Sequence, residues 1–275
     1  MSDRNLMDTA PGIHQPFRST DAVVTGASSG IGRAIAVELA KQGAERLLVH
    51  YRGNRKGAEE TVERLDSLGC EGVLCRADLA LDQEVDALIE FAFSRLDRVC
   101  TWVNNAGVDV LTGAASEWSF QKKLETLLRV DLVGTARLSR AVTDIWRQED
   151  RVAERSPPSM VFIGWDQAPL GMEGDAGQMF GSVKASVMAF AKSLAQDVAP
   201  GIRVNTVSPG WIQTSWGTVA SDYWDRRARS QALMQRWGRP DDVARAVAFA
   251  ACPENDFFHG QSVNVNGGWS RKFES

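Results

Sequence analysis

Residues 25–32, Thr-Gly-Ala-Ser-Ser-Gly-Ile-Gly, follow the apolar run Ala22-Val23-Val24 and open a helical pattern that begins at Ile31. The three glycines, Gly26, Gly30 and Gly32, let the backbone turn tightly and approach a bound group closely. A helix that starts directly after such a turn presents free N–H groups and the positive end of its dipole to an anion. The stretch therefore predicts a strand–turn–helix unit that binds the pyrophosphate of a dinucleotide.

Beyond this stretch, short apolar runs alternate with longer helical patterns. We expect strands at 22–25, 46–50, 72–75, 99–103, 159–163, 202–207 and 262–265, and helices at 31–42, 56–68, 82–95, 117–148, 178–198 and 240–250. Such alternation is typical of a parallel sheet joined by right-handed helical crossovers. Two irregular segments, 149–159 and 215–235, interrupt the pattern, and the second is placed where a lid could cover a site.

The composition excludes several classes of protein. A net charge of −4 gives no basic surface for nucleic acid, and no apolar run approaches the length of a membrane span. Residues 1–20 have no apolar core of a signal peptide and are expected to form a flexible arm before a single domain at 21–275. The four cysteines lack metal-ligand spacing, so we expect no metal site and reduced thiols in the cytoplasm.

Further motifs follow the glycine-rich stretch in order: Asp78-Leu79, Asn104-Asn105-Ala106-Gly107, Lys184 and Pro209-Gly210. Together they resemble the short-chain dehydrogenase/reductase family over Asp21 to Gly268. The resemblance implies an α/β single-domain Rossmann fold, with a doubly wound seven-stranded parallel sheet and helices on both faces. It also implies a small-molecule substrate and a homodimer or homotetramer.

The resemblance assigns a cofactor-binding role to a series of positions. Gly26, Ser28, Ser29, Ile31 and Gly32 would line the phosphates, Asp78 and Leu79 the adenine, and Asn104 and Ala106 the adjoining ribose. Lys184 would hold the nicotinamide ribose, while Ile212 and Thr214, after Pro209-Gly210, would touch the carboxamide and diphosphate.

The end of the second strand indicates which dinucleotide is bound. An NAD site usually carries a carboxylate there for the ribose 2′-hydroxyl. In this chain Tyr51, at the ribose end, is followed by Arg52, and Arg33 lies in the glycine-rich turn. Guanidinium groups suit a 2′-phosphate, so the sequence favours NADPH/NADP+.

The catalytic positions depart from the family. Where the family uses Asn, Ser, Tyr and Lys to move a proton, this chain has Asp131, then Trp165 followed by Asp166, then Phe180, and only Lys184 matches. A phenyl ring cannot donate a proton, so ordinary carbonyl reduction lacks its acid. Asp131 could also simply pair with Arg129 or Lys184, and Asp166 could be a turn residue.

The replacements suit a cation. Carboxylates and an aromatic face stabilise positive charge, and a cationic C=N group accepts hydride without a proton donor. We therefore predict reduction of an iminium-like, apolar aromatic cation, with Asp166 as its counter-ion, Asp131 as a second acidic group, and Trp165 and Phe180 beside it.

The same residues resemble a fungal branch of the family, the NADPH-dependent reductase/Diels–Alderases of bicyclic diazaoctane indole alkaloid biosynthesis of the paraherquamide and malbrancheamide type. That resemblance implies reduction of a natural-product cation and an intramolecular cycloaddition in one apolar pocket, which Trp165, Phe180, Trp211, Trp216 and Trp224 would build. Two alternatives stay open: a carbonyl reductase with an unusual donor such as Tyr223, and an inactive NADP-binding regulatory relative.

Overall fold

The computed structural model describes residues 14–149, 156–214, 217 and 221–270. Seven strands form one sheet: β1 (Asp21–Val24), β2 (Arg46–Tyr51), β3 (Glu71–Arg76), β4 (Val99–Asn104), β5 (Ser159–Ile163), β6 (Arg203–Pro209) and β7 (Ser262–Val265). Every neighbouring pair is parallel, and the order is β3-β2-β1-β4-β5-β6-β7. The order reverses between β1 and β4, the point at which open α/β sheets bind ligands. The predicted Rossmann fold is therefore confirmed.

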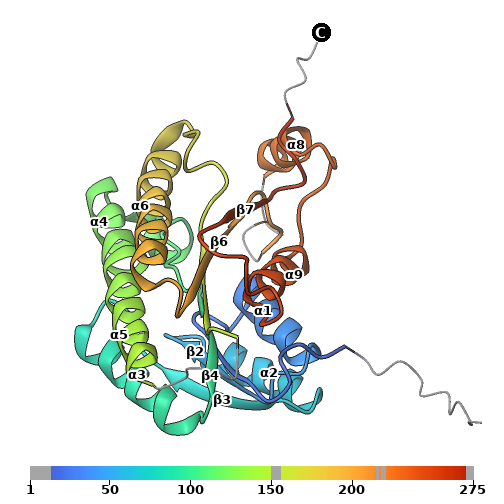
Figure 1. Ribbon diagram of the computed structural model, residues 1–275. Coiled ribbons are helices and arrows are strands. Elements are labelled where there is room, and N and C mark those ends of the chain that lie inside the picture. The colour runs from blue at the N-terminus through green and yellow to red at the C-terminus, as the bar shows by residue number, and fades with distance from the viewer. Residues whose placement is uncertain (1–13, 150–155, 215–216, 218–220, 271–275) are drawn as a thin grey trace, which may run out of the picture.

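Helices cover both faces of the sheet (Figure 1). Helices α1 (Gly30–Lys41), α2 (Arg55–Asp66) and α9 (Pro240–Ala251) lie on one face, and α3 (Asp82–Arg95), α4 (Phe120–Leu127), α5 (Thr135–Gln148) and α6 (Gly174–Val198) lie on the other. Each face buries its own apolar core, as the near-continuous Val and Leu runs of the central strands require. No helix in the described ranges is both long and apolar enough to cross a membrane.

The predicted helix at 117–148 is interrupted. A short 3₁₀ helix, η1 (Gly113–Glu117), precedes α4, and the wider π-helical turn η2 (Leu128–Gly134) separates α4 from α5. Helix α6 begins at Gly174, four residues before the predicted start, and the expected lid at 215–235 contains α8 (Asp222–Gln231). The π-helical turn contains Asp131, and such turns are frequent at functional sites.

The start of the domain differs from the predicted arm. Residues 14–20 form a turn against the sheet, in which the Phe17 backbone N–H donates to the Gln42 carbonyl at 3.1 Å. The Phe17 side chain is fully buried in the core on the α1 face. This part of the segment therefore packs with the domain because it carries one large apolar anchor.

Replacing this anchor tests its contribution to stability. We expect Phe17→Ala to lower the free energy of unfolding by about 3–5 kcal/mol, because a buried ring is lost and a cavity remains. Urea unfolding followed by circular dichroism measures the change. Phe257→Ala is the matched control, since the Phe257 side chain is fully exposed, and it should change stability by less than about 0.5 kcal/mol. Equal effects of the two substitutions would contradict the assignment.

Candidate active site

A cavity of ≈ 330 Å³ opens at the carboxyl ends of β1, β2, β3 and β4. Predicted cofactor residues among its lining are Gly26, Ser28, Ser29, Tyr51, Arg52, Asp78, Leu79 and Ala106. The lining also includes positions that we did not predict: His50, Gly53, Asn54, Ala77, Asn105, Gly107, Val108, Asp109 and Val130. The sequence motifs therefore converge on one concave site at the edge of the sheet where ligands are expected.

The glycine-rich turn depends on close backbone approach. Gly26 has φ of 65°, which favours glycine, and a Cβ on Gly32 would lie 2.3 Å from the Gly26 carbonyl oxygen. The Asn105 side-chain amide donates to the carbonyl oxygens of Thr25 at 2.8 Å and Gly26 at 3.2 Å. Asn105, at the end of β4, thus fixes the turn from the neighbouring strand.

His50 supports the same turn from the other side. Its Nδ1 accepts from the Gly26 N–H at 3.0 Å, so the ring is neutral with the proton on Nε2, which then donates to the Ala77 carbonyl at 3.0 Å. Complete burial lowers the His50 pKa to about 4, against a smaller opposing effect of the Ala77 hydrogen bond and the Asp78 charge. A single imidazole therefore ties the turn to β2 and to the end of β3.

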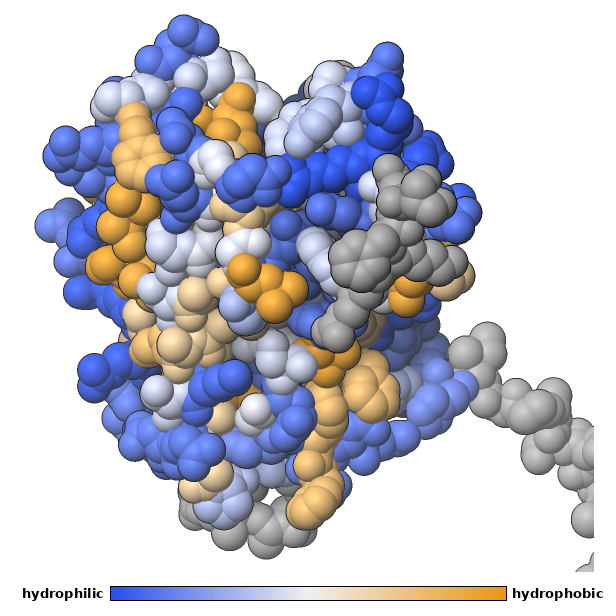
Figure 2. Space-filling view, turned by 90° about the horizontal axis from the view of Figure 1, so that it is seen from above, coloured by the Kyte–Doolittle hydropathy of each residue, from blue (hydrophilic) through white to orange (hydrophobic). Residues whose placement is uncertain are grey.

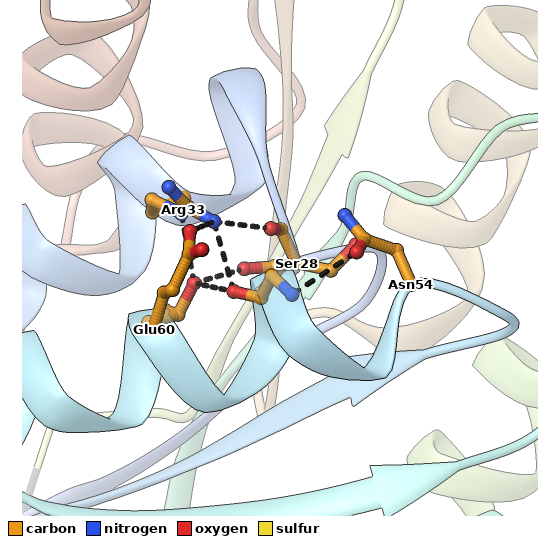
Figure 3. A network of polar contacts seen from close by, with 7 residues as sticks. Ser28, Arg33, Asn54 and Glu60 are labelled. Atoms are coloured by element: carbon orange, nitrogen blue, oxygen red, sulfur yellow. Dashed lines mark hydrogen bonds and ion pairs between the residues drawn. The ribbon is translucent and has the colours of Figure 1, made fainter.

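Arg33 has a structural role in this molecule. Its Nη2 donates to the carbonyl oxygens of Ser28 at 2.7 Å and Gly57 at 2.9 Å and pairs with Glu60 at 3.0 Å, while Nε donates to Thr61 at 3.0 Å. Figure 3 shows this network joining the glycine-rich turn to α2. These contacts hold the guanidinium within the protein, where it does not line the cavity. Its predicted contact with a 2′-phosphate would need them to rearrange.

Arg52 lines the cavity, and its exposed side chain makes no hydrogen bond or ion pair to another described residue. Beside it, Asn54 is engaged as the N-cap of α2, where its side chain accepts from the Gly57 N–H at 3.0 Å. Of the two predicted arginines, Arg52 is therefore the one placed to meet a ligand.

The remaining predicted cofactor residues do not line the cavity. Asn104 donates its side-chain amide to the Ser139 hydroxyl at 3.0 Å, so this side chain is directed toward α5. Ile212 is buried in the core on the α1 face. A Cβ on Gly30 would lie 3.7 Å from the Thr214 methyl, so the loop after β6 reaches the glycine-rich turn. Ile31 is the second residue of α1, Pro209 ends β6, and Gly210 directly follows it.

Asp131 and Lys184 form an ion pair. The Lys184 Nζ lies 3.2 Å from the Asp131 Oδ2 and 3.4 Å from the Ile163 carbonyl oxygen, to which it donates. The other Asp131 oxygen accepts from the Val108 N–H at 2.9 Å. Both side chains are mostly buried. The pairing of Asp131 with Lys184, one of the alternatives considered from the sequence, is thus what the structure contains, and the two charges neutralise each other.

Asp166 is a buried carboxyl group of a different kind. Only 4% of the residue is exposed, and its Oδ2 accepts from the Asn266 amide at 3.0 Å, whereas Oδ1 has no hydrogen-bond partner among the described residues. Burial raises the Asp166 pKa to about 6, against smaller opposing effects of Asn266 and of backbone N–H groups. A buried acceptor without a partner is costly, so a donor brought by a ligand would be favoured there.

Trp165 and Phe180 lie beside these groups. A Cβ on Gly181 would lie 3.7 Å from the Trp165 ring, so the indole packs against the first half of α6. Phe180 is half-buried and packs on the edge of the core that includes Met179 and Val183. Neither side chain carries an acid, so within this group only the carboxyls of Asp131 and Asp166 and the Lys184 ammonium can hold a proton.

Tyr223, the alternative proton donor, lies on α8. Its side chain is 53% exposed, and its hydroxyl accepts from the Arg227 guanidinium at 3.2 Å. Figure 2 looks onto this end of the molecule, where a notch separates the side that carries α6 from the side that carries α8. Trp216, predicted to line the same pocket, lies outside the described residues.

Comparison with known proteins gives the family. Residues 26–270 match a family model described as enoyl-(acyl carrier protein) reductase. A curated 3-oxoacyl-[acyl-carrier-protein] reductase from Staphylococcus epidermidis is 33% identical over 251 residues, which are 90% of this chain and 97% of that protein. The chain therefore belongs to the short-chain dehydrogenase/reductase family.

Solved structures agree with this assignment. A short-chain dehydrogenase from Burkholderia cenocepacia, determined with NADP, has a TM-score of 0.80 and 27% identity over 92% of this chain and 98% of its own. A doubly substituted short-chain dehydrogenase/reductase from Serratia marcescens has the same TM-score at 25% identity and the same coverage. The fold is thus shared with family members over nearly the whole chain.

The buried imidazole leads to a pH-dependent prediction. Because the His50 pKa is about 4 in the folded protein and about 6.5 when unfolded, the unfolded chain binds the extra proton first as the pH falls. We expect His50 to remove about 3 kcal/mol of stability between pH 6.5 and 4. Urea unfolding from pH 7 to 4 should show this loss in the wild type and its absence in His50→Gln.

The comparison with the variant is needed because Asp166 acts in the opposite direction. The Asp166 pKa is about 6 in the folded protein and ordinarily 3.8, so the folded state binds the proton first as the pH falls. Asp166 therefore adds to the free energy of unfolding as the pH falls through this range. The difference between wild type and His50→Gln isolates the imidazole. His14→Gln, at an exposed histidine that lies 3.2 Å from Glu254, is the control for the loss of a surface imidazole, and the large loss of stability assigned to His50 should persist in it. Identical profiles for wild type and His50→Gln would show that the assignment is wrong.

Proposed function

We propose that the protein is an NADPH-dependent reductase of a cationic C=N group in a small organic molecule. The observation that carries the proposal is the Asp166 carboxyl, which is buried with one oxygen lacking a partner. Its natural complement is a positive charge or an N–H donor brought by the substrate. The absence of a hydroxyl at Phe180 supports the same reading, because reduction of a carbonyl needs a proton that this side chain cannot supply.

The cofactor part of the proposal rests on the cavity. The glycine-rich turn, its supports His50 and Asn105, and the lining from β2 and β3 fit a dinucleotide. Arg52, at the ribose end, would meet a 2′-phosphate, and the Burkholderia relative was solved with NADP. When bound, NADPH supplies the hydride.

The charged side chains of the site would stabilise the substrate, and its aromatic side chains would enclose it. Asp166, in its ionised form, would hold the cation and stabilise it within a poorly solvated pocket. The Asp131–Lys184 pair would remain neutral overall, and Lys184 would keep its predicted role at the cofactor ribose. Trp165 and Phe180 would exclude water and orient a flat ring. As the C=N carbon gains hydride, the nitrogen regains its lone pair, so no proton has to be transferred.

A second candidate is reduction of a 3-oxoacyl thioester, the reaction named for the Staphylococcus relative. It would need a proton donor in place of a tyrosine, and Tyr223 is turned to Arg227 on α8. An NADP-binding protein without catalytic activity is the third reading. One assay, which follows NADPH oxidation, separates the three. An iminium reductase oxidises NADPH with N-methyl-3,4-dihydroisoquinolinium, and a 3-oxoacyl reductase does so with an acetoacetyl thioester. An inactive NADP-binding protein oxidises it with neither compound.

We also propose, from the resemblance to the alkaloid-forming branch, that the reduced product undergoes an intramolecular Diels–Alder closure in the same pocket. The support is two groups of aromatic side chains: Trp165 lies against α6, the helix that carries Phe180, and Trp211 contacts Trp224 of α8. Such a reaction needs chiefly a pocket that holds diene and dienophile in contact. We further propose a homo-oligomer, as in the family, and a cytoplasmic location, since Cys70, Cys75 and Cys252 are free thiols.

Asp166→Asn tests the catalytic assignment. We expect kcat/KM for N-methyl-3,4-dihydroisoquinolinium to fall about 10²-fold, because the counter-charge is lost while shape is kept. In the wild type kcat/KM should rise with pH through about 6, the Asp166 pKa, and the variant should lack this rise. NADPH absorbance measures both.

Asp144→Asn, an exposed carboxylate paired with Arg147, is the control for charge removal. A wild-type rate in Asp166→Asn would remove the assignment of that residue. If the double variant Trp165→Ser, Phe180→Tyr gained thioester reduction while the wild type never reduced an iminium, the proposed substrate class would be wrong.

Arg52→Ala tests the choice of cofactor. We expect KM for NADPH to rise about tenfold or more, since a charge-assisted contact to the 2′-phosphate is worth about 1.5–3 kcal/mol. KM for NADH should change little, because NADH lacks that phosphate. Arg55→Ala is the matched control: Arg55 lies three residues away, is exposed and pairs with Glu59. An equal change for NADPH and NADH would place Arg52 away from the phosphate.

A further inference from the structure

The lid helix α8 brings a guanidinium against two indole rings. The Arg227 Cζ lies 5.3 Å from the ring centre of Trp224 and 5.9 Å from that of Trp211, and the two ring centres are 5.6 Å apart. The three centres therefore form a nearly equilateral triangle, in which one cation lies within cation–π distance of both rings. We refer to Trp211 and Trp224 as the aromatic corner.

The counter-charge of Arg227 comes from another part of the chain. Both of its terminal nitrogens pair with the carboxylate of Glu173, with Nη2 at 3.0 Å from Oε2, and Nη1 also donates to the Tyr223 hydroxyl. Arg227 is only 14% exposed, whereas Glu173 is 69% exposed. Two aromatic faces and one carboxylate are the features of a recognition site for a flat cation, and here the protein's own arginine fills it.

The neighbouring carboxylate Asp225 on α8 is engaged elsewhere. Asp225 pairs with Arg229 and accepts from the Trp237 indole N–H, each at 2.8 Å. The Trp211 indole N–H donates to Gln231 at 2.8 Å, which fixes the ring. Glu173 is thus the carboxylate that the described structure directs at the Arg227 guanidinium.

The aromatic corner adjoins the reaction end of the site. Trp211 follows Gly210, on which a Cβ would lie 3.1 Å from the Asp166 Oδ2. Glu173 directly precedes α6, the helix that carries Phe180 and Lys184. A ligand at the aromatic corner would therefore lie between the two segments that border Asp166.

We infer that the aromatic corner and Glu173 form an entry site for a flat organic cation, and that Arg227 occupies this site until such a ligand displaces it. The inference rests on the proposed function for the charge of the substrate. Displacement is feasible because α8 is an exposed helix whose Ala228 alone is buried, so the long Arg227 side chain can turn to solvent. The carboxylate of Glu173 then pairs with the incoming cation.

Arg227→Met tests the entry site, with N-methylquinolinium as the charged probe and quinoline as a neutral ring of the same shape. Binding is measured by calorimetry without NADPH. Removing the competing guanidinium should tighten binding of N-methylquinolinium about tenfold and leave quinoline unchanged. The double variant Glu173→Gln, Arg227→Met should lose this gain, because the carboxylate is needed, and Trp224→Leu with Arg227→Met should lose it as well.

Arg226→Met is the matched control, because it removes the adjacent positive charge of α8 and should not change the affinity for either probe. If Arg227→Met and Glu173→Gln each tightened binding of both probes alike, the ion pair would only block access to the rings and would not recognise the charge of a ligand. That result, or an unchanged affinity in Arg227→Met, would overturn the inference. Because no turnover is measured, the outcome is independent of whether Asp166 supports hydride transfer.

Discussion

The close approach of the backbone at Gly26 and Gly32 is the constraint on which the rest of the site depends. No side chain fits between Gly32 and the Gly26 carbonyl, so β1 and α1 meet at one fixed angle. Asn105 holds this turn from β4 and His50 holds it from β2, so three strands share the same few hydrogen bonds. The cavity is bordered by these strand ends, and its shape follows from them. The groups that support the turn are therefore neutral side chains and backbone of the protein itself.

The two carboxyl groups near α6 have opposite surroundings. Asp131 lies in a π-helical turn, where it meets the Lys184 ammonium and a backbone N–H, so its charge is compensated within the protein. Asp166 pairs with no cation among the described residues, and its side-chain partner there is the Asn266 amide. Environments that differ in this way separate the roles of two acids, as they do in enzymes that use one carboxyl as a structural anion and another as an active group. The ion pair also explains how Lys184 is kept in position without a tyrosine.

The sequence predicted the strands well because buried parallel strands read as short apolar runs, and β7 was placed at its observed bounds. The glycine-rich turn and much of the cavity lining also followed from local motifs. The break of the helix near Asp131 could not be predicted, because a π-helical turn has no distinct residue pattern and depends on packing against the loop at Val108. The hydrogen bond from Gly26 to His50 and the contact of Arg33 with Gly57 in place of a ligand also could not be predicted. Both join residues that are far apart in the sequence, and one sequence does not show which distant residues meet.

The reaction proposed from Phe180 has a proton balance that differs from that of carbonyl reduction. Reduction of a ketone takes up one proton for each hydride, so the equilibrium of that reaction shifts with pH. Addition of hydride to an N-alkylated iminium takes up none, since the positive charge of the acceptor is cancelled by the hydride itself. A half-buried phenyl ring at this position therefore fits the proposed reaction, whose equilibrium at given substrate and product concentrations depends on the ratio of reduced to oxidised cofactor. The direction of such a reaction is set by that ratio and not by the acidity of the surrounding solution.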